Sequence, residues 1–251
     1  MKSIILSIVV ILWWSTGLNA QIVNIEKQRL ATDSTGLFGD AFATMALQRN
    51  TKNFLSLNAG GHLSYENNKN RWLMIGEFGF VRGEGERFSN EGFFHLRYAR
   101  ELGKFTWWES FSQMQFNRLT KIDNRWLTGT GGRFQLTDYE NALFFFGLLY
   151  MYEREVLKDP REINNDHRLS SYFSFSMVPQ PTISLYSTTY IQPRIDRWSD
   201  YRLLTENTLN LGITDKLSFT VRLRLTYDSA PPIGVPTLIY DFHNGLTYQF
   251  K

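Results

Sequence analysis

A strict alternation of apolar and polar residues is the feature that most constrains how this chain folds. In residues 238–250 apolar or aromatic side chains occupy almost every second position, and mostly polar or small residues stand between them. Successive side chains of a β-strand point to opposite faces of the sheet. The segment therefore predicts a strand with one apolar face and one polar face. The apolar face carries Leu238, Tyr240, Phe242, Leu246, Tyr248 and Phe250.

The same alternation recurs from Leu37 onward in about twelve segments of about 10–12 residues, each bounded by turn-forming residues. Strands of this length suit a tilted crossing of a bilayer. Longer loops are expected to alternate with tight turns, as in single-chain outer-membrane barrels with short periplasmic turns. The tight turns are expected at residues 66–70, 102–104, 137–141, 179–181 and 214–216. Residues 82–89 and 154–167 are expected to be two of the longer loops.

These patterns predict an all-β fold, a closed antiparallel up-and-down transmembrane β-barrel of about twelve strands, with ten as the alternative count. Because no strand edge can stay unpaired in lipid, the last strand is expected to pair with the first. A soluble sandwich or soluble barrel would alternate in the same way. The aromatic content of 16% and the character of the N-terminus favour the membrane barrel.

The N-terminus has the anatomy of an export signal. A basic start precedes an apolar run, Ile4 to Trp14, that is too short to span a bilayer as a helix. We expect a signal peptide over residues 1–20, an N-terminal periplasmic lead-in over 21–36 and the barrel over 37–251. An uncleaved anchor is the alternative. The expected location is the outer membrane of a Gram-negative bacterium, as an integral protein.

The C-terminus indicates the expected partners. Tyr248 and Phe250 look like the C-terminal signal that the barrel-assembly machinery recognises in outer-membrane proteins. We expect the chain to be a monomer that contacts outer-membrane lipid and lipopolysaccharide. A net charge of +3, spread along the chain, gives no indication of nucleic-acid binding.

Ionisable side chains fall on the polar face of the predicted strands, where they would form a charged network in the lumen. Neighbouring strands place opposite charges together, as for Arg97 and Glu109, or for Arg224 between Glu206 and Asp241. The predicted network consists of His95, Arg97, Glu109, Arg125, Arg133, Glu153, Arg168, Arg202, Glu206, Arg222, Arg224, Asp228, Asp241 and His243. Two interpretations stay open: a structural network that fills the lumen, or a narrow pore for small polar or anionic solutes, since arginines outnumber carboxylates.

A barrel enzyme acting on lipid or peptide is the alternative function. His243 and Asp241 are two residues apart on a strand, about 7 Å, which is too far for a direct hydrogen bond. No motif places a serine beside them. We therefore assign no catalytic residue, cofactor or metal ligand. A calcium site in residues 159–166 has little support, since Pro160 and Arg161 interrupt the acidic residues.

A succession of short motifs resembles one family. Residues 94–98 (Phe-x-Leu-Arg-Tyr), 109–117 (Glu-x-Phe-x-Gln-x-Gln-x-Asn) and 125–133 (Arg-x-Leu-x-Gly-x-Gly-x-Arg) are similar to the YdiY-like family, domain of unknown function 481. Residues 152–155, 168–170 and 190–193 fit its later strands. The resemblance implies an outer-membrane barrel, and some members are labelled salt-induced. It implies no established activity or catalytic residue.

Overall fold

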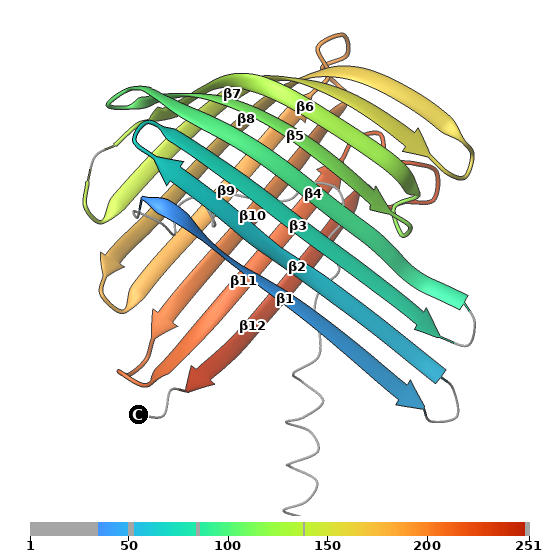
Figure 1. The fold of residues 1–251 in the computed structure, drawn as a ribbon, viewed down its shortest axis with the longest axis horizontal. Coiled ribbons are helices and arrows are strands. Elements are labelled where there is room, and N and C mark those ends of the chain that lie inside the picture. The colour runs from blue at the N-terminus through green and yellow to red at the C-terminus, as the bar shows by residue number, and fades with distance from the viewer. Residues whose placement is uncertain (1–34, 50–52, 84–85, 138, 249–251) are drawn as a thin grey trace, which may run out of the picture.

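The fold is an antiparallel sheet in which each strand pairs with its neighbours in the sequence. The computed structural model describes residues 35–49, 53–83, 86–137 and 139–248. The expected signal peptide, nearly all of the lead-in, and Phe250 lie outside these residues. The sheet contains twelve strands, which lie side by side in the order of the sequence (Figure 1). They are β1 (Gly36–Arg49), β2 (Asn53–Asn67), β3 (Asn70–Gly83), β4 (Glu86–Gly103), β5 (Thr106–Asn117), β6 (Ile122–Gln135), β7 (Ala142–Leu157), β8 (Glu162–Gln180), β9 (Ile183–Pro193), β10 (Tyr201–Gly212), β11 (Leu217–Asp228) and β12 (Leu238–Tyr248).

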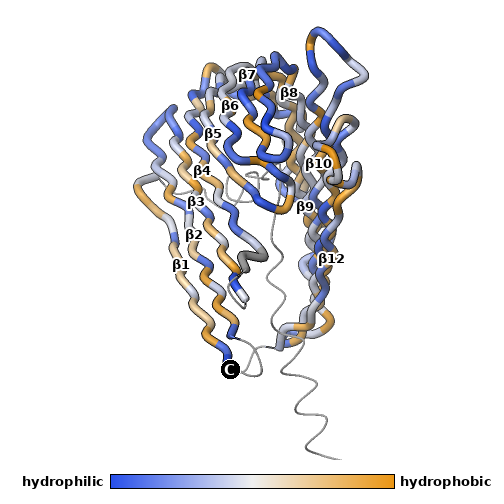
Figure 2. The backbone as a smooth tube through the Cα atoms, turned by 90° about the vertical axis from the view of Figure 1, so that its right-hand side faces the viewer, coloured by the Kyte–Doolittle hydropathy of each residue, from blue (hydrophilic) through white to orange (hydrophobic). Residues whose placement is uncertain are grey.

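The sheet curls strongly, but its two edge strands stand apart. Figure 2 shows β1 and β12 at opposite sides of the opening. Over the described residues, β1 pairs with β2 and β12 pairs with β11, and no pairing joins the two edges. The all-β, up-and-down antiparallel architecture is confirmed, whereas closure stays a prediction. Within the same residues, no helix has the length and apolarity needed to cross a membrane.

The predicted alternation of faces is confirmed by burial. Trp126 is 57% exposed, whereas its neighbour Arg125 is 1% exposed. Met114 is likewise exposed and Gln113 buried. The concave face of the sheet thus buries charged and polar side chains, and the convex face carries large apolar ones. Such a distribution is the reverse of that in a soluble protein.

Two of the predicted long loops are wrong, because the strands continue through them. β3 reaches Gly83 and β4 begins at Glu86, while β7 reaches Leu157 and β8 begins at Glu162. Antiparallel pairing between the strands continues almost to the ends of these hairpins, as between Glu155 of β7 and Asn164 of β8. The tight turns are confirmed in place, though three of them, at residues 66–70, 102–104 and 179–181, begin or end inside strands. The longer connections are residues 194–200 and 229–237, both at the end where odd-numbered strands finish.

Candidate functional site

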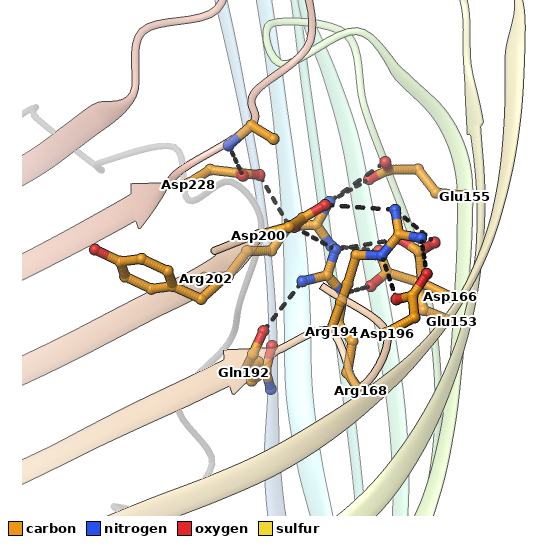
Figure 3. Close-up of polar contacts among 12 residues, drawn as sticks. Glu153, Glu155, Asp166, Arg168, Gln192, Arg194, Asp196, Asp200, Arg202 and Asp228 are labelled. Carbon is orange, nitrogen blue, oxygen red and sulfur yellow. Dashed lines mark hydrogen bonds and ion pairs between the residues drawn. The ribbon is translucent and has the colours of Figure 1, made fainter. Parts of the chain in front are cut away.

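The strongest concentration of charge on the inner face is centred on Glu153 of β7. Glu153 is fully buried. Its Oε1 accepts hydrogen bonds from Nε of Arg125, at 2.6 Å, and from Nη1 of Arg202, while its Oε2 accepts from Nε of Arg168, at 2.8 Å. Three strands therefore direct an arginine at one carboxylate of a fourth. Figure 3 shows two of these arginines, Arg168 and Arg202, beside Glu153. We call the set Glu153, Arg125, Arg168, Arg202, Glu155, Asp166, Asp200 and Asp228 the Glu153 cluster.

The outer members of the Glu153 cluster complete the pairing of its arginines. Arg202 also donates to Asp228, at 2.8 Å, and lies 3.3 Å from Glu155. Arg168 contacts Asp166 and Asp200, at 3.2 Å each. Buried charges are retained only where they are paired and hydrogen-bonded. The cluster therefore ties β6, β7, β8, β10 and β11 together as one unit.

The connection 194–200 is held against this cluster. Arg194 contacts Asp166 at 3.2 Å and Asp200 at 3.4 Å, and its backbone N–H bonds to the Asp200 carbonyl. Arg194 also forms a two-point pair with the exposed Asp196. Those hydrogen bonds hold the pKa of the Asp196 carboxyl below its usual range. The backbone N–H of Ile195 bonds to the His167 carbonyl, which fixes the connection to β8.

A second buried network lies nearer the opposite end of the interior. Arg97 of β4 pairs with Glu109 of β5 at 2.7 Å, as the sequence predicts. The hydroxyl of Tyr172, from β8, donates to the same carboxylate oxygen at 3.0 Å. Arg133 approaches the Tyr172 hydroxyl at 3.4 Å, and its guanidinium lies 3.9 Å from the ring centroid of Phe145. We call Arg97, Glu109, Tyr172 and Arg133 the Glu109 network.

An apolar layer lies beside these two networks. Inward-facing side chains of β5 to β10 pack together there, which the alternation did not predict. Glycines make room for its rings: a Cβ on Gly129 would lie 2.5 Å from the Phe111 ring, and one on Gly147 would collide with the Tyr172 ring. The layer fills this side of the interior with side chains. It consists of Phe111, Leu127, Leu149, Met151, Tyr172, Tyr190 and Leu204.

The inner face of β11, β12, β1 and β2 differs sharply from this packed side. We call it the open wall. Its members are half-buried or exposed, and most are small or polar. Arg222 of β11 lies directly opposite His243 of β12, and Asp40 of β1 contacts His62 of β2 at 2.5 Å. The open wall consists of Asp40, Phe42, Thr44, Ser56, Asn58, Gly60, His62, Ser218, Thr220, Arg222, Asp241, His243, Gly245 and Thr247.

The connection 229–237 reaches across the interior at the end that holds the Glu153 cluster. Nζ of Lys121, in the β5–β6 connection, donates to the carbonyl of Ile233 at 2.6 Å. Strands β6 to β11 separate these two connections along the sheet. Val235, beside this contact, is buried. The contact therefore places part of this connection over the mouth of the curved sheet.

The predicted charged residues fall into four groups. Eight of them lie in the Glu153 cluster or the Glu109 network: Arg97, Glu109, Arg125, Arg133, Glu153, Arg168, Arg202 and Asp228. Glu206 and Asp241 both lie opposite Arg224, as predicted from the sequence. His95 bonds to Gln113 at 3.0 Å and stacks between Phe93 and Phe111. Arg222 and His243 lie on the open wall.

Sequence reasoning missed several members of the Glu153 cluster. Glu155 and Asp166 were assigned to a loop, although they continue the alternation of Glu153 and Arg168, and that signal could have found them. Asp166 contacts Arg168 and Arg194. These ion pairs occupy a carboxylate that a calcium-binding loop in this region would need. Asp200 and Arg194 lie in an irregular connection, and no periodic signal identifies them. Across the described ranges, no group of three or more potential ligands is arranged to hold a metal ion.

Comparison with known proteins identifies one family. The model of the family "Protein of unknown function, DUF481" matches residues 43–250. No curated protein matches the chain.

Solved structures with a similar course of the chain have low sequence identity to it. One, described as "NanC porin structure in rhombohedral crystal form", has a TM-score of 0.46 at 9% identity, covering 85% of this chain and 99% of that one. Another, the translocator domain of autotransporter NalP from Neisseria meningitidis, has a TM-score of 0.42 at 9% identity, covering 89% and 92%. Because these TM-scores are below 0.5, we base no inference on them.

Proposed function

This chain belongs to the family described as proteins of unknown function, DUF481, and from that premise we propose that it is an integral outer-membrane β-barrel protein with a narrow polar passage. Closure through β1 and β12 would complete the barrel. In lipid, an unpaired strand edge would leave a row of backbone groups without partners, at a cost of several kcal/mol each.

The convex face supports membrane insertion. Large apolar side chains stand exposed on it along β1 to β9 and β12, far beyond the patch that a soluble monomer tolerates, and those of β10 and β11 are half-buried. In a bilayer the same side chains would face lipid. Examples are Leu47, Leu63, Trp72, Phe94, Trp108, Met114, Trp126, Leu148, Phe173, Ile191, Phe242 and Leu246.

The division of the inner face carries the proposal of a passage. Side chains just fill a barrel of about eight strands, while barrels of about sixteen to eighteen strands leave an aqueous channel. A barrel of twelve strands lies between these cases. The size of its inward-facing side chains therefore decides whether a passage remains open. Bulky and ion-paired side chains fill the β4–β10 side, whereas the open wall has mainly small polar ones. The remaining space would run along the open wall.

The charges along this passage favour small polar solutes without a strong preference for anions. The excess of arginines suggests anions, but Arg97, Arg125, Arg168 and Arg202 are paired with buried carboxylates on the packed side. Beside the open wall, Arg224 stands between Glu206 and Asp241.

Single-channel recording with cysteine modification tests the passage, because the chain contains no cysteine. We expect the purified protein to give small, discrete conductance steps in planar bilayers. In the variant Thr220→Cys, a bulky methanethiosulfonate reagent should lower the step by about half or more, since Thr220 lies on the open wall.

The matched control is Ser174→Cys, because Ser174 faces inward on the packed side and is fully buried. Its conductance should not change with the reagent. Silence of the wild-type protein at high protein load would contradict the passage. An equal response of the two variants would contradict its position.

A further inference from the structure

The ends of β1, β2 and β3 form a cavity that neither the charged networks nor the open wall includes. Its volume is about 680 Å³. It lies at the end where odd-numbered strands finish, which is also the end of the longer connections 194–200 and 229–237. The cavity is lined by Leu47, Gln48, Arg49, Asn53, Phe54, Leu55 and Arg82.

The cavity combines two cations with an apolar surface. Arg49 and Arg82 both line it, and no carboxylate is among its lining residues. Within the described residues, neither guanidinium forms an ion pair. Arginine binds phosphate with two parallel hydrogen bonds, which makes it the preferred side chain for phosphate recognition. The charge of the cavity is therefore complementary to a phosphate group.

The apolar part of the cavity continues the lipid-facing surface. Leu47, Leu55 and Arg82 lie directly opposite one another on adjacent strands, so they share one face of the sheet. It is the convex face, because Leu63 and Tyr65 of β2 point to the same side and are exposed. Leu47 itself is 70% exposed. A ligand held by both arginines would thus lie with its remainder against the exposed Leu47 and the half-buried Leu55.

We propose that this cavity binds a phosphorylated lipid headgroup of the outer leaflet, with Arg49 and Arg82 on the phosphate and Leu47 and Leu55 against the acyl chains. The proposal rests on the proposed membrane insertion, with the longer connections on the outer side. In that orientation both arginines lie near the outer ends of their strands, β1 and β3, where the phosphates of the outer leaflet are expected. Free phosphate would make no use of the leucines.

Binding of lipid A to the full chain in detergent, followed by native mass spectrometry, tests the assignment. The double variant Arg49→Ala, Arg82→Ala should weaken binding of bisphosphorylated lipid A at least about tenfold. Removal of both phosphates from lipid A should weaken its binding to the wild-type protein to a similar extent. Inorganic phosphate should compete poorly, since it lacks acyl chains.

The matched control is Arg154→Ala, because Arg154 is an exposed arginine at the same end of the convex face but does not line the cavity. Binding to this variant should stay within about twofold of the wild type. An equal loss in the control, or equal binding of phosphate-free lipid A, would overturn the proposal. Displacement by inorganic phosphate at equal concentration would overturn the lipid assignment. A protein that binds lipid A in this way but conducts no ions would contradict the passage and leave this site standing.

Discussion

Replacing Glu153 by glutamine should destabilise the fold by about 3–5 kcal/mol, the cost of breaking a buried ion pair by removing one partner. Glutamine keeps the shape of the side chain but removes the charge that faces Arg125, Arg168 and Arg202. Three buried guanidinium groups would then share only the outer carboxylates of the Glu153 cluster. The measurement is the urea midpoint of the folded protein in detergent, followed by tryptophan fluorescence.

The matched control for this variant is Asp196→Asn. Asp196 also pairs with an arginine of the same region, but its side chain is 65% exposed. Exposed ion pairs contribute little because water and salt screen them. The urea midpoint of this variant should not be separable from that of the wild type. If Glu153→Gln unfolds at the same urea concentration as the control, the cluster does not hold the strands together.

Replacing Gly147 by alanine should cost about 2–4 kcal/mol, because it both overpacks the apolar layer and displaces a hydrogen bond. The new Cβ would collide with the ring of Tyr172. The ring would have to move, and its hydroxyl would leave Glu109, which it now contacts at 3.0 Å. The urea midpoint again gives the measurement.

The control for this change is Gly76→Ala on β3, because a Cβ added there would have nothing within 4 Å. That variant should stay within about 0.5 kcal/mol of the wild type. The change Tyr172→Leu should cost much less in a chain that already carries Gly147→Ala than it does alone, because the two sites share one contact. Equal costs for Gly147→Ala and Gly76→Ala would contradict the packing of the apolar layer.

The sequence was sufficient to predict the strands, their facing and part of the buried charge. Alternation placed Arg97 and Glu109 on one face of neighbouring strands, and an ion pair of 2.7 Å joins them. This alternation can be recognised in the sequence because side chains of a strand return to the same face every two residues. It is kept because an ionised side chain on the apolar convex face would cost free energy.

The apolar layer could not be predicted in the same way. β7 has apolar side chains on both faces. The two-residue alternation of apolar and polar side chains therefore does not show that Leu149 and Met151 are buried. Their burial depends on contacts with strands up to three places away in the sheet. The position of the connection 194–200 likewise depends on tertiary ion pairs of Arg194 with Asp166 and Asp200 rather than on local sequence.

Closure of the sheet is the central claim, and a disulfide between β1 and β12 tests it most directly. The natural chain has no cysteine to interfere. Ala43→Cys on β1 can be combined in turn with Phe242→Cys, Asn244→Cys or Leu246→Cys on β12, all expected on the convex face. For one of these pairs, mild oxidation of the protein in outer membranes should give nearly complete cross-linking, seen as a shift in gel migration. Failure of all three pairs to cross-link, in protein that is folded and inserted, would contradict a closed barrel.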